Sequence, residues 1–270
     1  MTRWKDATLY ELESSPIATH YVNLDLCRKE DVLRGGWKLR GCWYHYDKQV
    51  IGPHGPLLPI RVEQLSEGPG LFIFRDYIPL GWIPKLQNYV VPVMRAEQVP
   101  PTSDWPAGEP SMANFAWIHD ADIGNATGVW LGRKVELTTG LKAVGILSER
   151  LKVALYSLVA ELSPHHDAHL TFSSVPIDPK NYIDYAATLL IYLNTVERGG
   201  STVFPAAGIA VAPRKGNALY YHLLWRNGTI DKRWVYATCP IPLGVKWTTT
   251  KWIRDSENIL NRNCDVDQNV

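Results

Sequence analysis

The chain has 270 residues, of which 46% are hydrophobic, and its 28 lysines and arginines nearly balance its 27 aspartates and glutamates. This length allows one domain with a large core and a smaller appendage. A formal charge of +1 at pH 7 argues against nucleic-acid binding driven by bulk electrostatics. The longest apolar runs, such as residues 186–193, are strand-length and fall short of the ~18–20 residues that cross a bilayer. We therefore expect neither a nucleic-acid partner nor a membrane span.

Residues 1–56 are polar and rich in glycine and proline turns, and they include Cys27 and Cys42. We expect a small lead-in segment here, without a core of its own. Residues 57–262 then form the main domain, and residues 263–270 form a C-terminal tail.

Several segments of the main domain carry local signals. Leu71–Tyr77 is aromatic and apolar between glycine and proline residues, which predicts a strand. The proline-rich residues 100–110 predict a loop. Leucine or valine at positions 141, 144, 147 and 151 predicts a helix over Leu141–Leu151. The following segment, Leu151–Glu161, is expected to open a series of strands.

Residues 164–252 alternate short β-rich runs with Gly, Pro and Asn turns at roughly ten-residue spacing. This spacing is typical of an antiparallel sandwich or barrel. We therefore expect a mainly β chain with flanking helices, in the α+β class.

His165 and Asp167 lie two apart, so on a strand they point to the same face and can hold one cation. A neutral imidazole beside a carboxylate suits Fe(II) better than Mg or Ca. The pair is two-thirds of the 2-His-1-carboxylate set of non-haem iron oxygenases. The alternative is a His-x-Asp sequence in a histidine-rich surface turn.

A series of ordered motifs surrounds this pair. They are His165-x-Asp167, Thr188-x-Leu190-x-Tyr192-Leu193-Asn194, Gly199-Gly200-x-Thr202-x-Phe204-Pro205, Gly216-x-Ala218-Leu219, Cys239-Pro240, Gly244-x-Lys246-Trp247 and Lys251-Trp252. Their order over about ninety residues resembles the catalytic domain of collagen prolyl 4-hydroxylase α subunits.

The resemblance implies a double-stranded β-helix, or jelly roll, with residues 57–262 forming a 2-oxoglutarate/Fe(II) dioxygenase-type domain. It also implies hydroxylation of peptidyl proline in collagen-like substrates, with Fe(II), 2-oxoglutarate and ascorbate as cofactors. The implied partners are a proline-rich or collagen-like peptide and a protein disulfide isomerase subunit. The family further has a helix where this chain has Ile83–Met94.

The implied metal ligands are His165, Asp167 and Tyr236. In the family a second histidine precedes the Cys-Pro by three residues and the oxoglutarate-binding lysine by ten, and both spacings here end on Tyr236. A neutral phenol is a poor Fe(II) ligand, because with a pKa near 10 it depends on the metal for deprotonation. His169 shares the face of Asp167, but four residues of strand span roughly 13 Å. His166 and His222 are expected to pack or to be solvated.

The resemblance assigns 2-oxoglutarate binding to Lys246, Tyr156 and Thr188. A buried ammonium requires a partner, so a lysine at the end of a core strand suggests an anion receptor. The alternatives are a lysine whose head reaches solvent at the barrel rim and a tyrosine that only packs in the core.

Matching positions in the family imply disulfides Cys27–Cys42 and Cys239–Cys264. Four unrelated buried thiols are the alternative. Disulfides imply an oxidising compartment, so we expect the endoplasmic reticulum lumen or secretion. Met1–Asp6 lacks the apolar stretch of a secretory signal, so we expect the sequence to be a fragment.

Two functional hypotheses follow from the residues at this site. The first is an active prolyl 4-hydroxylase. The second is a catalytically silent paralogue that keeps the fold and the oxoglutarate pocket and serves as a peptide- or subunit-binding module. A cupin-like sugar- or metal-binding jelly roll is a third reading, disfavoured by Lys246 and the cysteine pattern. Tyr236 separates the first two.

Overall fold

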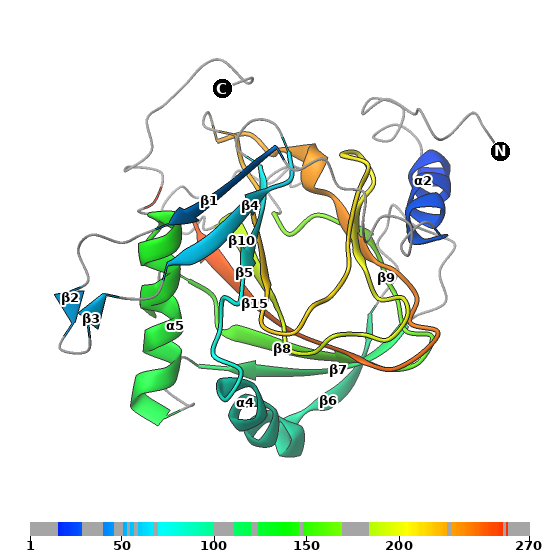
Figure 1. The fold of residues 1–270 in the computed structure, drawn as a ribbon. Coiled ribbons are helices and arrows are strands. Elements are labelled where there is room, and N and C mark those ends of the chain that lie inside the picture. The colour runs from blue at the N-terminus through cyan, green and yellow to red at the C-terminus, as the bar shows by residue number, and fades with distance from the viewer. Residues whose placement is uncertain are drawn as a thin grey trace, which may run out of the picture.

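The computed structural model describes part of the chain, and the elements are labelled in Figure 1. The described residues are 16–28, 40–45, 51–52, 55–56, 59–66, 70–99, 111–119, 124–145, 148–168, 184–225, 228–255 and 258. His169, Cys264, the loop expected at 100–110 and the tail expected at 263–270 lie outside these residues.

The helices are α2 (Pro16–Arg28), α4 (Trp82–Val90) and α5 (Gly124–Thr139), with 3₁₀ turns η1 (Val91–Val93) and η3 (Lys232–Trp234). The strands are β1 (Gly41–His45), β2 (Ile51–Gly52), β3 (Gly55–Pro56), β4 (Ile60–Gln64), β5 (Leu71–Arg75), β6 (Arg95–Val99), β7 (Ser111–Ile118), β8 (Leu151–Tyr156), β9 (Leu162–His165), β10 (Tyr185–Tyr192), β11 (Thr202–Phe204), β12 (Ile209–Val211), β13 (Ala218–His222), β14 (Tyr236–Thr238) and β15 (Lys246–Arg254). No described helix has the length and apolarity needed to cross a bilayer.

Two antiparallel sheets enclose a common interior, as Figure 1 shows. The major sheet has nine strands in the order β1-β4-β5-β13-β10-β15-β8-β7-β6, and the minor sheet has four in the order β12-β11-β14-β9. The expected class is confirmed: the protein is mainly β with flanking helices, and its fold is a double-stranded β-helix.

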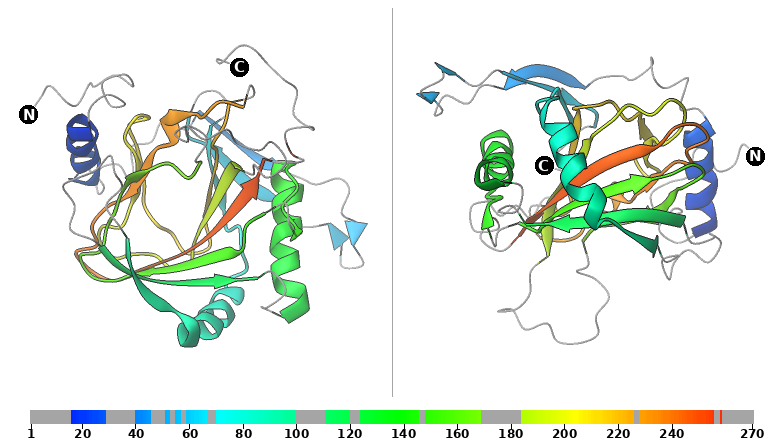
Figure 2. Two further views of the ribbon diagram at one scale, coloured as in Figure 1. Left: turned by 180° about the vertical axis from the view of Figure 1, so that it is seen from behind. Right: turned by 90° about the horizontal axis from the view of Figure 1, so that it is seen from below.

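Strand β10 shows why the sequences of the central strands are continuously apolar: it is buried along almost its whole length. Side chains alternate along a strand, so Leu189 and Ile191 face outward and Leu190 and Tyr192 face inward. The outward pair packs beneath α4 and α5, which cover the outer side of the major sheet (Figure 2). The inward pair packs between the two sheets. Both faces of the strand are therefore buried. The polar residue Thr188, on the inward face, donates a hydrogen bond to Asp167 in the interior.

The prediction of a helix over Leu141–Leu151 is wrong. Residues 141–145 are irregular, Gly145 has a φ of +66°, and β8 begins at Leu151. Leu141 and Leu151 are nevertheless buried in the outer core, so their spacing reflects a loop packed against the sheet. The helix lies earlier in the chain, in α5.

Two other expected elements are present. The helix implied by the resemblance at Ile83–Met94 is α4 followed by η1, and Pro84 is tolerated because it lies in the first turn of the helix. The strand expected at Leu71–Tyr77 is β5. Strand β1 precedes residue 57 and pairs with β4, so the major sheet begins before the expected domain boundary. The division at that boundary stays a prediction.

The expected disulfide pairing is wrong. Cys27 is bridged to Cys239, with Cα atoms 5.5 Å apart, while Cys42 is a free, exposed cysteine. Neither Cys27–Cys42 nor Cys239–Cys264 can therefore form. The cause is the packing of α2, whose Val22 and Leu26 join a buried cluster on the minor sheet. This packing brings Cys27 to the residue after β14, whereas β1, which carries Cys42, lies at the edge of the major sheet.

The bridge predicts different effects for two cysteine substitutions. Cys27→Ala should lower the free energy of unfolding by ~2–4 kcal/mol, because the bridge restricts the unfolded chain. Cys42→Ala, the matched control, should leave it nearly unchanged. Urea unfolding of both variants, with mass spectrometry of unreduced peptides, measures this. A Cys27–Cys42 cross-linked peptide would contradict the observed pairing.

Candidate metal and dicarboxylate site

His165, Asp167 and Tyr236 come together at the ends of two paired strands of the minor sheet. His165 on β9 stands opposite Tyr236 on β14, and their ring centroids are 4.3 Å apart. Asp167 follows two residues after His165, and its Oδ1 lies 3.7 Å from the His165 Nε2. The His165 Nδ1 contacts the Ser163 carbonyl oxygen at 2.9 Å, which orients the ring. The structure thus places the three expected metal ligands side by side.

The buried Asp167 carboxylate is surrounded by hydroxyl donors. Tyr236 donates to Oδ1 at 3.1 Å, and Thr188 donates to Oδ2 at 2.7 Å. Tyr221, opposite Thr188 on the neighbouring strand β13, donates to the same oxygen at 3.4 Å. A carboxylate has about four acceptor positions, so these three hydroxyls fill most of them.

Tyr236 acts as a hydrogen-bond donor at this site. Burial raises the pKa of Tyr236 well above the usual phenol value, and the Asp167 charge raises it further. The same two causes raise the pKa of Tyr221. A neutral phenol that donates a hydrogen bond to Asp167 keeps its proton and does not present an anionic oxygen to Fe(II).

The donor set therefore does not fit the 2-His-1-carboxylate triad. Among the described histidines, His165 is the one whose ring nitrogen lies within 4 Å of the Asp167 carboxylate, and both oxygens of Asp167 already accept hydrogen bonds. Among the described residues, no group of three or more histidine, cysteine or acidic side chains is arranged to hold a metal ion.

The other histidines of the motif region differ in position. His166 Nδ1 accepts from the Ala168 N–H, so its Nε2 donates to the Asp231 carbonyl oxygen at 3.2 Å. Burial lowers the pKa of His166. His222 Nε2 lies 3.3 Å from the hydroxyl of Tyr220, on its own strand. Neither ring is among the groups bonded to Asp167.

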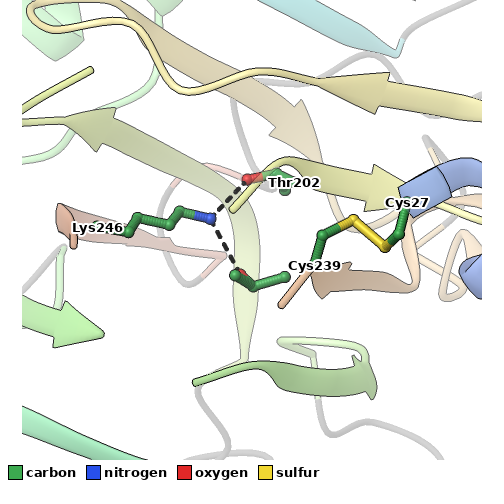
Figure 3. The surroundings of a disulfide bond; sticks show 5 residues. Cys27, Thr202, Cys239 and Lys246 are labelled. Atoms are coloured by element: carbon green, nitrogen blue, oxygen red, sulfur yellow. Dashed lines mark hydrogen bonds between the residues drawn. A yellow bond between two sulfur atoms is a disulfide. The ribbon is translucent and has the colours of Figure 1, made fainter. Parts of the chain in front are cut away.

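A second polar centre surrounds Lys246, whose side chain is 1% exposed. Its ammonium donates to Thr202 at 3.3 Å and to Thr238 at 3.1 Å. Figure 3 shows Lys246 reaching from β15 towards Thr202, with the Cys27–Cys239 bridge beyond it. Both threonine oxygens accept from Lys246, so each hydroxyl proton remains able to donate. An ammonium and two hydroxyl donors form a receptor that suits a carboxylate.

The two centres are joined through β14. Tyr236 and Thr238 are two residues apart, so they point to the same side of the strand. One contacts Asp167 and the other contacts Lys246. The Asp167 carboxylate and the Lys246 ammonium are therefore contacted by two neighbouring side chains on the same face of β14.

The structure revises which residues surround Lys246. Tyr156 stands opposite Lys246 on β8, with its ring centroid 5.9 Å from the ammonium. Thr188 donates to Asp167. Sequence reasoning missed Thr202 and Thr238 as partners of Lys246. Thr202 belongs to the Gly-Gly-x-Thr motif and Thr238 lies two residues from Tyr236, so period-two alternation from Tyr236 was an available signal for Thr238.

A row of stacked aromatic rings lies on the same sheet face as Lys246. Trp252 stacks between Trp117, at 5.7 Å, and Tyr185, at 5.8 Å. Trp252 pairs in register with Thr188, whose hydroxyl bonds Asp167, so the row adjoins the Asp167 centre. Trp117 is 39% exposed, whereas the buried indole N–H of Trp252 has no hydrogen-bond partner among the residues that the structure describes.

Sequence comparison relates the chain to one group of proteins. It is 31% identical over 252 residues to prolyl 4-hydroxylase subunit alpha-2 of Caenorhabditis elegans, covering 91% of this chain and 45% of that protein. It is 29% identical over 243 residues to subunit alpha-2 of Gallus gallus, covering 88% and 44%. The human alpha-1 subunit is 26% identical over 245 residues. The chain spans less than half the length of these relatives. No family model matches it.

Structural comparison agrees with the assigned fold. The viral collagen prolyl hydroxylase vCPH from Paramecium Bursaria Chlorella virus-1, in its 2OG complex, matches with a TM-score of 0.52 and 18% sequence identity. The match covers 68% of this chain and 95% of that one. A truncated form of the same viral protein matches with the same TM-score. At this identity the likeness supports the double-stranded β-helix fold alone.

The raised pKa values of Tyr221 and Tyr236 predict loss of stability at alkaline pH. Above pH ~10 the unfolded chain releases phenolic protons that the folded protein retains, so the free energy of unfolding falls as pH rises. Below pH ~10 the two tyrosines make their full contribution to the free energy of unfolding. Tyr236→Phe should reduce the slope by up to ~1.4 kcal/mol per pH unit. Urea unfolding between pH 8 and pH ~11 measures it.

Tyr44→Phe, at an exposed position on β1, is the control for removal of a phenol. A phenolate absorption band that forms near pH ~10 in the folded protein and disappears in Tyr236→Phe would contradict the neutral, donating Tyr236.

Proposed function

Because this chain is a divergent relative of the prolyl 4-hydroxylase alpha subunits, we propose that it binds a proline-rich peptide and a 2-oxoglutarate-type dicarboxylate while Tyr236 impairs its iron centre. It is thus a prolyl 4-hydroxylase-like binding module with little hydroxylase activity of its own. The observation that carries this proposal is the hydrogen bond from the Tyr236 hydroxyl to Asp167.

That hydrogen bond replaces what a metal ion would do for Asp167. A buried carboxylate must be compensated, either by a cation or by donors. Tyr236, Thr188 and Tyr221 supply donors from three different strands. Iron would have to displace the Tyr236 proton, and burial opposes formation of the phenolate.

The dicarboxylate part of the proposal rests on Lys246. Its ammonium and the hydroxyls of Thr202 and Thr238 would hold one carboxylate of 2-oxoglutarate. None of these three groups depends on Tyr236. Binding of the dicarboxylate is therefore expected to survive the loss of the iron ligand.

The peptide part of the proposal rests on the aromatic row of Trp117, Trp252 and Tyr185. Aromatic surfaces recognise proline-rich segments, which lose little entropy because the polyproline conformation is already extended. The buried indole N–H of Trp252 would donate to a peptide carbonyl. A collagen-like peptide is the expected ligand, by analogy with the relatives.

A second candidate function is an active Fe(II)- and 2-oxoglutarate-dependent prolyl 4-hydroxylase that uses ascorbate. The approach of His165 Nε2 to Asp167 Oδ1, at 3.7 Å, favours it, because these two groups retain two-thirds of the metal set. The third ligand would then be His169 or a Tyr236 phenolate.

The compartment and the partner protein are proposed from the disulfide and from the relatives. The Cys27–Cys239 bridge supports an oxidising compartment, and we propose the endoplasmic reticulum lumen or secretion. A protein disulfide isomerase subunit is a proposed partner by the same relationship.

Iron binding tests the main proposal through Tyr236→His. The substituted imidazole should raise Fe(II) affinity at least ~tenfold, since even changes outside the ligands shift affinity 10–100-fold. Anaerobic calorimetric titration of Fe(II) into the natural protein, Tyr236→His and the control Tyr236→Phe measures this. Affinity for 2-oxoglutarate without iron should be the same in all three, because Lys246 is unchanged.

Turnover separates the two candidate functions. Release of labelled carbon dioxide from 2-oxoglutarate should be nearly absent in the natural protein, and any release in Tyr236→His should vanish when His165→Ala is added. Stoichiometric Fe(II) binding with proline hydroxylation by the natural protein would reject the silent-module proposal and support the second candidate.

Peptide binding tests the aromatic row. Trp117→Ala should weaken binding of a labelled (Pro-Pro-Gly) repeat peptide by about tenfold, since aromatic side chains that anchor an interface contribute more than ~1 kcal/mol each. Trp43→Ala, at an exposed tryptophan on β1, is the matched control. Fluorescence anisotropy measures both. Equal affinity in the natural protein and Trp117→Ala would exclude the row as the peptide surface.

A further inference from the structure

The structure has a cavity of about 650 Å³ whose lining includes neither Asp167 nor Lys246 nor any residue of the aromatic row. It lies where β4, the end of β5, the loop after β10 and the connection from β12 to β13 meet. Its charged lining residues are Arg61, Glu63, Arg75, Asp76, Arg214 and Lys215, and the polar residues Thr195 and Asn217 also line it. A space of this size suits a small organic molecule.

The charges that line this cavity leave a positive surplus. Arg61 pairs with Asp76, and Arg75 pairs with Glu63 at 2.5 Å, so both carboxylates are neutralised within the wall. The remaining ionic groups are the exposed side chains of Arg214 and Lys215. Among the described residues, neither of these two side chains has an ion-pair partner.

Asn217 adds a neutral donor from a buried position. Its side chain is 6% exposed, and its Oδ1 accepts from the Asp76 N–H at 3.1 Å. Asp76 has a φ of +49°, a left-handed conformation that aspartate adopts more readily than most residues other than glycine. Within the described part of the chain the Asn217 amide nitrogen donates no hydrogen bond, and the residue lines the cavity.

Thr195 supplies a further donor. Its Oγ1 accepts from the Lys215 N–H at 3.0 Å, so its own hydroxyl proton is available. The cavity wall therefore offers a guanidinium, an ammonium, an amide N–H and a hydroxyl, whereas its carboxylates are engaged. Such a wall favours an oxyanion and disfavours a cation.

We propose that this cavity binds a small molecule carrying phosphate or carboxylate groups, at a site separate from the dicarboxylate receptor at Lys246. Arg214 and Lys215 would neutralise the anion, and Asn217 and Thr195 would orient it. The proposal does not depend on hydroxylase activity or on iron.

Calorimetric titration with inorganic pyrophosphate and, separately, with citrate tests the site. The buffer contains 150 mM salt, where the Debye length of about 8 Å suppresses diffuse attraction. Arg214→Ala with Lys215→Ala should weaken binding at least ~tenfold, as expected for the loss of two charge-assisted contacts. Lys85→Ala with Arg133→Ala removes the same charge from exposed positions on α4 and α5, and should have no effect.

The outcomes assign the chemistry or reject the site. Saturable binding of pyrophosphate alone supports a phosphate ligand, and binding of citrate alone supports a carboxylate ligand. Absence of binding by either anion, or equal weakening in both double variants, would overturn the proposal. Binding that is lost in Lys246→Met but kept in Arg214→Ala with Lys215→Ala would also overturn it, because the anion would then occupy the dicarboxylate receptor.

Discussion

The buried carboxylate of Asp167 is the group on which the arrangement of the barrel interior depends. An uncompensated charge in a low-dielectric interior is costly, so the surrounding strands must supply donors. They do so from β10, β13 and β14, through Thr188, Tyr221 and Tyr236. The same hydrogen bonds connect the major sheet to the minor sheet. The Tyr236 phenol thus helps to compensate the Asp167 charge, which on the proposed function a metal ion would otherwise compensate.

Strand β14 links this centre to the rest of the molecule. Tyr236 and Thr238 point to one side of it and connect Asp167 to Lys246. Cys239, the next residue, is covalently joined to α2. The strand that positions both polar centres is thus held by sheet pairing on both edges and by a disulfide at its end. On the proposed function, this anchoring would keep the Lys246 receptor formed in the absence of iron.

The aromatic row and the charged cavity are suited to ligands of different kinds. Trp117 and Trp252 present stacked rings, which suit an extended apolar peptide and need little charge. Arg214 and Lys215 present exposed cations beside a buried amide, which suit an oxyanion. On the two proposals, these surfaces would serve ligands of different chemistry, and occupancy of one would not require the other.

Local spacing was enough for the mainly β class, for the strands of the motif region and for the placement of His165 and Asp167 on one face, because alternation along strands is a property of the chain itself. The grouping of Tyr236 with this pair came from the resemblance of the ordered motifs to a known family. The helix expected at Leu141–Leu151 failed because apolar spacing reports burial and cannot distinguish a packed loop from a helix. The partners of Asp167 and Lys246, the cavity at Asn217 and the Cys27–Cys239 bridge were decided only by tertiary structure. Each joins segments far apart in sequence, up to 212 residues for the bridge. Such contacts depend on how α2 and the two sheets pack, which no local pattern encodes.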